Sequence, residues 1–149
     1  MSELAARIAA IEARQAIADL VHGYARAIRH DRPEDVPALF APDGWFEIRD
    51  GHPSQAGFTV RTRLDSPEAF LAYLLPGKGK PHPVPMIHNL MVDLDLARSV
   101  ASATAVMEAP VIGTPHRVMG EYRDSFRCIG SRWLFASRIY TIFAAASSV

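Results

Sequence analysis

Cysteine, net charge and long apolar runs are all scarce in this sequence, and each absence narrows the possibilities. The single cysteine, Cys128, cannot form a disulfide within the chain. The 16 Lys and Arg residues balance 16 Asp and Glu residues, so no charge excess would attract nucleic acid or an anionic membrane surface. No segment approaches the roughly 20 apolar residues of a membrane span, and Glu3 and Arg7 interrupt any secretory signal, so we expect a cytoplasmic protein.

Signatures of metal and phosphate chemistry are also missing from the sequence. The six histidines show neither His-x-x-x-His nor Cys/His spacing, so no metal site is predicted. The run Gly77-Lys78-Gly79-Lys80 lacks the Ser or Thr and the helix that complete a phosphate-binding loop. A Gly-x-Ser-x-Gly elbow is absent as well, which argues against acyl-transfer hydrolysis.

The chain does contain enough apolar material for one core. Its 149 residues are 49% hydrophobic and 21% charged, which fits a single domain over residues 1–149. A chain without net charge and with this much apolar surface tends to self-associate, so we expect a homo-oligomer, either a dimer or a trimer. The tail, residues 144–149, is expected to fray.

The first forty residues have helical periodicity. Apolar residues recur at three- and four-residue spacing over residues 4–28, which predicts one long amphipathic helix with Tyr24 on its apolar face. Ser2 can cap the start of this helix, and the His-Asp-Arg-Pro run at 30–33 ends it. A second short helix is predicted over residues 36–40, ahead of an Ala-Pro-Asp-Gly turn.

Beyond residue 44 the apolar period changes from helical spacing to two, the period of a strand. One short helix interrupts the strands at 67–74, capped by Ser66, and a loop from Pro76 to Pro85 follows that could close a pocket. Helices first and antiparallel strands later predict an α+β fold. The predicted strands cover about 45–49, 57–63, 85–95, 99–112, 117–129 and 132–143.

Five segments stand in an order and spacing typical of a known group. They are Tyr-Ala-Arg-Ala-Ile at 24–28, Ala-Leu-Phe-Ala-Pro-Asp at 38–43, His-Asn at 88–89 with Val-Asp-Leu-Asp-Leu-Ala at 92–97, Gly-Glu-Tyr-Arg-Asp-Ser-Phe at 120–126, and Gly-Ser-Arg-Trp-Leu-Phe at 130–135. Together they resemble the SnoaL-like branch of the NTF2-like superfamily, which includes scytalone dehydratase-like and bile-acid dehydratase-like proteins. The resemblance covers nearly the whole chain.

This resemblance implies a strongly curved antiparallel or mixed sheet, wrapped around N-terminal helices to form a cone-shaped pocket for a small apolar molecule. Members include dehydratases, isomerases, cyclases and dehydrochlorinases, and others are non-catalytic subunits or binding proteins. The resemblance also implies that no metal or organic cofactor is needed. A dry cavity shifts the pKa of a buried carboxylic acid or histidine, so one group can remove a proton while another donates one.

His88 is the leading candidate for a catalytic base. Strand alternation places it on the same face as Met86, Leu90 and Val92, so we expect it to point into the interior. The resemblance implies that a histidine at this place works with an aspartate as general base. The alternative is a core histidine satisfied by a neighbour.

The expected acidic partner of His88 is replaced in this sequence. The resemblance implies an aspartate directly after Ile28, where Arg29 stands, and a tyrosine at Ile28 itself. Asp31 is the nearest acid, but a shift of two residues turns a helical side chain by about 200°, which leaves a capping or turn role as the alternative. Glu108, in an apolar run, is a second candidate acid, with an ion-paired surface position as its alternative.

Other side chains are candidates for contact with a substrate. The Tyr24 hydroxyl is expected either to orient a substrate carbonyl or to be satisfied while its ring packs. Asp124 is expected to pair with Arg138 or with a neighbouring Arg123, and Arg138 to bind an anionic group or to lie on the surface. The predicted substrate-binding residues are Arg29, Trp45, Tyr122, Asp124 and Arg138.

Three functions remain open at this level. The first is a cofactor-independent, dehydratase-like lyase or isomerase acting on a mostly apolar oxygenated ring compound, with His88 as base, Tyr24 as donor and Glu108 or Asp31 as acid. The second is a non-catalytic ligand-binding protein, or an assembly partner like the small subunit of ring-hydroxylating oxygenases, because arginine occupies the place of the expected acid. The third is a polyketide-type cyclase that uses Asp124.

Overall fold

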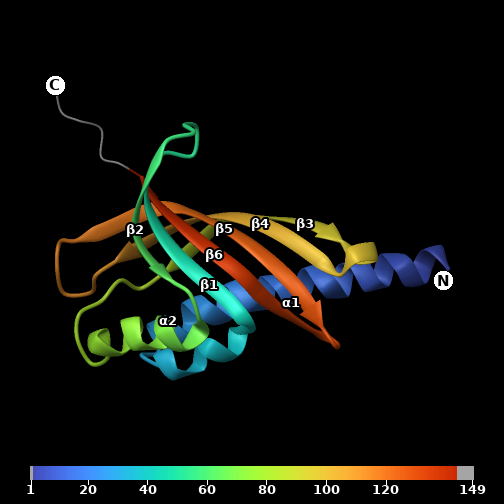
Figure 1. The fold of residues 1–149 in the computed structure, drawn as a ribbon, viewed down its shortest axis with the longest axis horizontal. Helices are drawn as coiled ribbons and strands as arrows, with labels where there is room; N and C mark the ends of the chain where they lie inside the picture. The colour runs from blue at the N-terminus through green and yellow to red at the C-terminus, as the bar shows by residue number, and fades with distance from the viewer. Residues whose placement is uncertain (1, 144–149) are drawn as a thin grey trace.

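A computed structural model describes residues 2–143, and Figure 1 shows one long helix beside a twisted sheet. The helix α1 spans Glu3–Arg29, and the predicted cap is confirmed because the Ala5 amide donates to Ser2 Oγ at 3.1 Å. Only the second half of α1 is buried, from Ala13 onward. In the first three turns the large apolar side chains Leu4, Ile8 and Ile11 are exposed, because the helix extends past the sheet there.

The segment after α1 differs from the predicted short helix. It forms two 3-10 turns, Pro33–Asp35 and Pro37–Leu39, instead of a helix over 36–40. Each turn begins with a proline, which lacks the amide hydrogen that an α-helix interior requires. The predicted Ala-Pro-Asp-Gly turn lies inside strand β1, Phe40–Gly51, as an irregularity that shifts the register with strand β6, Arg132–Phe143, between Phe40 and Trp45.

The remaining elements follow the predicted pattern closely. Helix α2 spans Pro67–Leu74, and the Ala69 amide donates to Ser66 Oγ at 3.0 Å, so its predicted cap is also confirmed. The strands besides β1 are β2 (Phe58–Leu64), β3 (Met86–Asp95), β4 (Val100–Pro110), β5 (Arg117–Ile129) and β6 (Arg132–Phe143).

The six strands form one mixed sheet with the order β2-β1-β6-β5-β4-β3. All neighbouring pairs are antiparallel except β1 and β6, which run parallel. The predicted α+β fold with a strongly curved mixed sheet is thus confirmed. Because β1 pairs with β6, the first and the last strand along the chain are neighbours inside the sheet.

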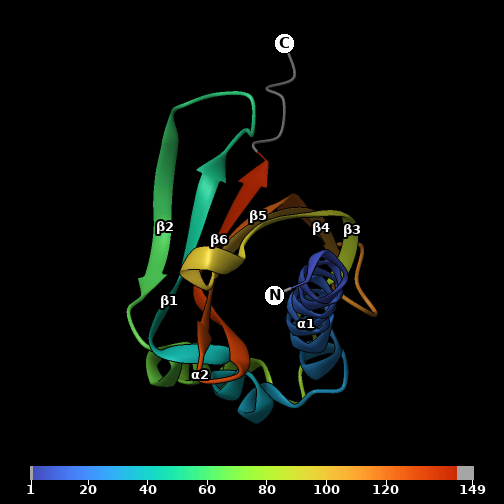
Figure 2. The ribbon, with the colours of Figure 1, turned by 90° about the vertical axis from the view of Figure 1, so that its right-hand side faces the viewer.

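Figure 2 shows the sheet curling around α1, with α2 closing one end of the concave side. The core lies between this concave face and α1, and one apolar cluster joins the helix to β1, β4, β5 and β6. Gly120 permits a close approach of β5 to β6, because a Cβ there would lie 2.1 Å from the Thr141 carbonyl oxygen. The curvature leaves space that α1 and α2 do not fill.

Candidate ligand cavity

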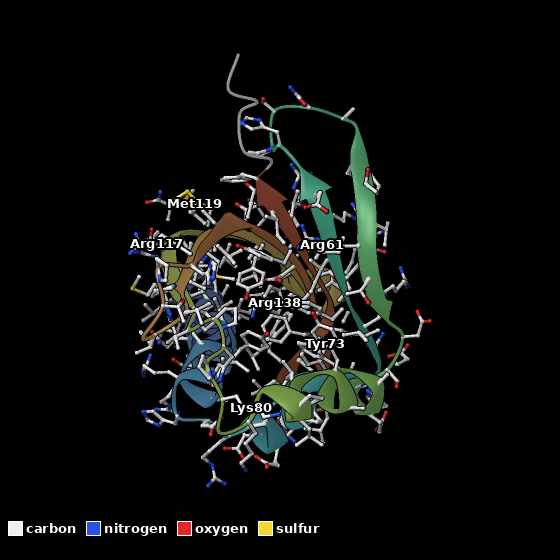
Figure 3. All side chains as sticks on the ribbon, turned by 90° about the vertical axis from the view of Figure 1, so that its left-hand side faces the viewer. Arg61, Tyr73, Lys80, Arg117, Met119 and Arg138 are labelled. Atoms are coloured by element: carbon white, nitrogen blue, oxygen red, sulfur yellow. The ribbon has the colours of Figure 1, made fainter. Side chains whose placement is uncertain are left out.

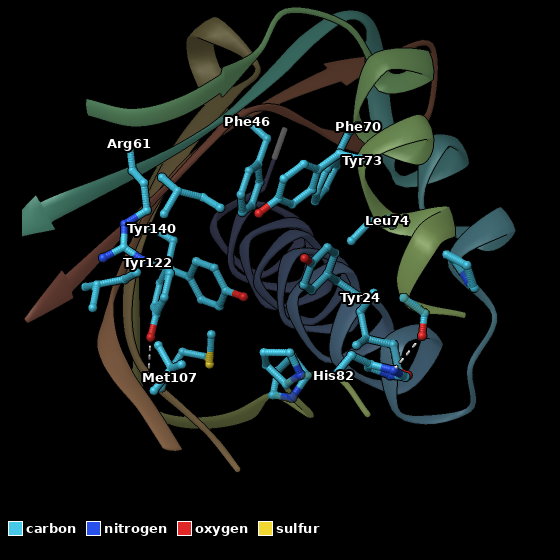
Figure 4. A pocket seen from close by; sticks show the side chains of 18 of the residues that line it. Tyr24, Phe46, Arg61, Phe70, Tyr73, Leu74, His82, Met107, Tyr122 and Tyr140 are labelled. Atoms are coloured by element: carbon cyan, nitrogen blue, oxygen red, sulfur yellow. Dashed lines mark hydrogen bonds between the residues drawn. The ribbon is translucent and has the colours of Figure 1, made fainter. Parts of the chain in front are cut away.

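A cavity of about 290 Å³ lies between the second half of α1, helix α2 and the concave face of the sheet. Its walls are mainly apolar, with Phe46 from β1, Phe70 and Leu74 from α2, and Met107 from β4 (Figure 4). These side chains meet because strand alternation and the apolar face of α2 both direct them inward. The Phe46 and Phe70 rings stack with their centroids 4.3 Å apart.

Four tyrosines bring hydroxyl groups to this apolar cavity: Tyr24, Tyr73, Tyr122 and Tyr140. The Tyr140 hydroxyl donates to the Met107 carbonyl at 3.1 Å, whereas the hydroxyls of Tyr24 and Tyr122 point toward the middle of the cavity (Figure 4). Burial raises the pKa of Tyr122 to about 12 and the pKa of Tyr24 well above its ordinary 10. Both hydroxyls therefore stay protonated at neutral pH and can donate to a ligand oxygen.

A buried ion pair lies directly behind two of these tyrosines. Arg138 is fully buried, and it donates to Asp124 from Nε at 2.9 Å and from Nη2 at 3.3 Å. The Arg138 guanidinium lies 3.4 Å from the ring centroid of Tyr122 and 4.6 Å from that of Tyr24. Burial raises the pKa of Asp124 to about 6, although Arg138 lowers it. Of the two predicted partners of Asp124, Arg138 is thus the one observed, and of the two alternatives for Arg138 the surface position is wrong.

Part of the cavity wall is formed by the loop that follows α2. Asp31 accepts a hydrogen bond from the Gly79 amide at 2.9 Å, and Lys78 forms an ion pair with Glu34. Asp31 therefore has the turn role that was its alternative, while its side chain also lines the cavity. These contacts connect the loop to the chain just after α1.

His82 lies in the same loop and lines the cavity. Its Nε2 lies 3.2 Å from the Ile28 carbonyl oxygen, and its Nδ1 lies 2.8 Å from that of Lys80 and 3.2 Å from that of Gly77. Burial alone lowers the pKa of His82, but these three carbonyls and Asp31 outweigh it and raise the pKa above 6.5. A protonated ring is favoured because it donates from both nitrogens.

The structure contradicts the inward position expected for His88, whose side chain is 49% exposed on the outer face of the sheet. A β-bulge causes this, because the register with β4 shifts between His88 and Met91 and Asn89 has φ 54°. The extra residue inverts the alternation, so Ile87 points inward before the bulge and Leu90 after it. His88 therefore cannot reach the cavity.

Three more predicted site residues also lie outside the cavity. Glu108 is on the outer face, where Oε1 lies 3.7 Å from His88 Nε2 and Oε2 lies 3.6 Å from Arg117 Nη1, so its ion-paired alternative is the observed one. Arg29 is exposed on the outer side of α1, because its neighbour Ile28 occupies the inward position. The Arg63 guanidinium lies over the Trp45 ring, 3.8 Å from the ring centroid. The next residue along the strand, Phe46, points into the cavity instead.

The cavity thus gathers Tyr24, Asp31 and Tyr122 from the predicted set, with Asp124 and Arg138 behind them. Sequence reasoning missed Tyr73 and His82 as cavity residues. Tyr73 shares the predicted apolar side of α2, which was the available signal. No local signal identified His82, which stands between prolines in a loop.

Within 2–143, no three His, Cys, Asp or Glu side chains are grouped in a way that could hold a metal ion. No helix in the same range has the length and apolar character needed to cross a membrane. The predicted fraying of the tail concerns residues 144–149, which lie outside the described part of the chain.

A curved mixed sheet that encloses an apolar cavity around one long helix defines the NTF2-like class of α+β proteins. Three solved structures with this fold come from Novosphingobium aromaticivorans. An NTF2-like protein with a cystatin-like fold is 19% identical over 97% of this chain and 90% of its own, with a TM-score of 0.73. A protein assigned as the beta subunit of an aromatic-ring-hydroxylating dioxygenase is 19% identical over 94% and 95%, also with a TM-score of 0.73. A protein assigned as a scytalone dehydratase is 17% identical over 93% and 89%, with a TM-score of 0.68.

The family itself is established by sequence. Residues 9–139 match the SnoaL-like domain, so this chain belongs to the SnoaL-like family, as the five segments predicted. A search of curated protein sequences finds no match. The family and the fold are therefore shown, and these structures, which share 17–19% of their residues with this chain, support the fold alone.

Proposed function

We propose that this protein binds an apolar, oxygen-bearing ring compound in its cavity. The observation that carries the proposal is the arrangement of two tyrosine hydroxyls, from Tyr24 and Tyr122, inside a mainly apolar cavity. Apolar walls with a few convergent polar groups are the usual composition of a small-molecule site. The ring would pack against Phe46 and Phe70, and its oxygen would accept hydrogen bonds from the two hydroxyls.

The volume limits the size of the ligand. Small-molecule sites commonly range from about 300 to 1,000 Å³, so a cavity of about 290 Å³ fits a compound of one or two rings. His82, the imidazole at the wall, faces carbonyl oxygens with both ring nitrogens, so it is not poised as a free base. This arrangement favours binding over proton abstraction.

Titration calorimetry with a one-ring and a two-ring probe, acetophenone and 1-indanone, tests the proposal. We expect saturable binding, and a melting temperature that rises with probe concentration. Val118→Phe should fill the cavity and weaken binding at least tenfold. Met119→Phe is the matched control, since Met119 is the next residue of β5 and is 45% exposed on the opposite face (Figure 3). Absence of binding by both probes, or equal binding by the Val118 variant, would contradict the proposal.

A second candidate is lyase or isomerase chemistry on the same kind of ring compound. The observation that favours it is that His82 and Asp31 both line the cavity, where Tyr24 could donate to a substrate carbonyl. A cyclic β-hydroxy ketone is a suitable substrate, because loss of water would give a conjugated ketone with a new ultraviolet absorption. His82→Asn should then reduce kcat with little change in KM. Unchanged absorption with the unmodified protein would eliminate this candidate.

A further inference from the structure

We propose that the outward face of the first three turns of α1 is a docking surface for a second copy of this chain, in a parallel two-helix contact. Three large apolar residues form this surface, the α1 stripe: Leu4, Ile8 and Ile11. None of them lines the cavity, so the inference goes beyond the proposed function and does not depend on it. The direction of the stripe, its spacing and the charges beside it support the inference.

The α1 stripe faces away from the sheet. Each of its residues stands nine positions before a buried residue of the same helix, and nine positions are about two and a half helical turns. The buried residues are, in order, Ala13, Ile17 and Leu20. The two sets therefore lie on opposite sides of α1, and the stripe side chains are 47–65% exposed where the helix extends past the sheet (Figure 1). Large apolar side chains gathered on an exposed face mark an interaction surface.

The spacing of the stripe is that of a helix pair. Leu4, Ile8 and Ile11 follow one another at four and then three residues, which in the heptad notation abcdefg are positions d, a and d. The next a position is Gln15, whose amide donates to Asp19 Oδ1 at 2.9 Å, so the apolar contact ends after Ile11. A contact of this length is smaller than the interfaces of stable complexes, so the dimer should dissociate at micromolar concentrations.

The charges beside the stripe select a second copy in parallel orientation. Arg7 stands at position g and Glu12 at position e, on the two flanks of the stripe. In a parallel pair, position g of one helix meets the e position of the next heptad in the other, so Arg7 of each copy meets Glu12 of the other. An antiparallel pair would bring like flanks together, arginine against arginine and glutamate against glutamate. Both side chains are exposed, and no ion pair within residues 2–143 involves either of them.

A lipid surface fits the stripe less well than a second copy does. Helices that lie on membranes have a polar face rich in Lys and Arg. In this half of α1, Arg7 and Arg14 are balanced by Glu3 and Glu12, and the Arg14 guanidinium donates to the Val92 carbonyl at 2.6 Å. The balanced flanks favour a partner with the same alternation of charge, which a second copy provides.

Analytical ultracentrifugation over a concentration series tests the contact. We expect a monomer–dimer equilibrium that Ile8→Glu and Ile11→Glu each shift toward the monomer by about tenfold, because each places a charge in the centre of the contact. Both side chains are exposed, so circular dichroism should show an unchanged fold. Met91→Glu is the matched control, since Met91 is a 68% exposed apolar residue of β3, and it should leave the equilibrium unchanged.

Charge reversal tests the orientation. Arg7→Glu and Glu12→Arg should each weaken the dimer about fivefold, because the symmetry of the pair repeats each like-charge contact. The double variant should recover the dimer of the unchanged chain, and an equimolar mixture of the two single variants should associate more tightly than either variant alone.

A disulfide provides a second measure of orientation, because equivalent residues of the stripe meet across a parallel pair. In a Cys128→Ser background, Leu4→Cys should oxidise to a covalent dimer. Ala6→Cys is the control, since a shift of two residues turns the side chain by about 200°, away from the stripe, and it should stay monomeric under the same conditions.

The outcomes are decisive in each arm. A monomer at every concentration would overturn the inference, and so would a dimer that Ile8→Glu and Ile11→Glu leave intact, since the copies would then meet elsewhere. Single charge reversals without effect, or a double variant no better than they are, would overturn the parallel pairing. Binding of the monomer to phosphatidylcholine vesicles that Ile8→Glu abolishes would assign the stripe to lipid and overturn the inference as well.

Discussion

The buried pair of Arg138 and Asp124 gives the most discriminating prediction. The stability cost of removing Arg138 should grow with pH, whereas the cost of removing Asp124 should not. Asp124→Asn leaves a guanidinium that cannot lose its proton, fully buried and without a counter-ion. Arg138→Met leaves a carboxylate that can become neutral by taking up a proton. Both substitutions remove the same hydrogen bonds, but Asp124→Asn leaves a permanent buried cation and Arg138→Met leaves a carboxyl group that can become neutral.

The structure sets the size of both effects. Removing one partner of a buried ion pair costs about 3–5 kcal/mol, a large share of the roughly 5–15 kcal/mol that stabilises a domain. In the unchanged protein, burial raises the Asp124 pKa from 3.8 to about 6, so the stability that this group contributes is greatest below pH 3.8 and falls by about 3 kcal/mol as pH rises through 6. Without Arg138 the pKa rises further, and the fall continues to higher pH.

Urea denaturation between pH 6.5 and 8.5 tests this reasoning. The cost of Arg138→Met should grow with pH by at least about 1 kcal/mol over this range, whereas the cost of Asp124→Asn should stay constant within about 0.5 kcal/mol. The double variant should cost less than the sum of the two single changes. Costs below about 1 kcal/mol for both single variants, or a pH dependence in the Asp124 variant only, would refute the account of the pair.

Four further predictions concern other parts of the molecule. Because the His82 pKa is raised from 6.5, both ring nitrogens donate to carbonyls below pH 6.5, and one of the two donors is lost as pH rises through the folded-state pKa. Hydrogen exchange at the Gly79 amide in the same loop should therefore accelerate beyond the intrinsic pH effect, and should not do so in His82→Asn. His88→Ala should change the free energy of unfolding by less than about 0.5 kcal/mol in urea denaturation, and a cost above about 2 kcal/mol would contradict its outer position. Ser66→Ala should cost about 1 kcal/mol by the same measurement, since it removes the cap of α2, and Ser54→Ala is the loop control. The absence of net charge predicts self-association, and light scattering that gives the mass of a monomer would refute it.

Much of the fold followed from local signals. The predicted strands at 117–129 and 132–143 match β5 and β6 residue for residue, because long alternating runs leave little choice of boundary. Ser2 and Ser66 marked both helix starts, since a side chain that satisfies free amide groups is a local requirement. Tyr24 could be assigned to the interior for the same reason, because helical spacing alone defines the face.

The candidate site was less predictable, because it depends on contacts between distant segments. His88 was misplaced by one extra residue in β3, a bulge that no local pattern announced and that turned the side chain outward. His82 reached the cavity only because its loop folds back onto the end of α1. Neither position could be derived from neighbours in the sequence.

The amino-acid sequence by itself determined most of the elements, the family and the inward direction of Tyr24, since these depend on periodicity and on residues close along the chain. The tertiary structure decided which polar groups meet. Arg138 and Asp124 stand on adjacent strands with 13 residues between them, and Tyr24 comes from a helix packed against both. The curvature of the sheet brought these groups behind one cavity, and curvature arises from the pairing of all six strands.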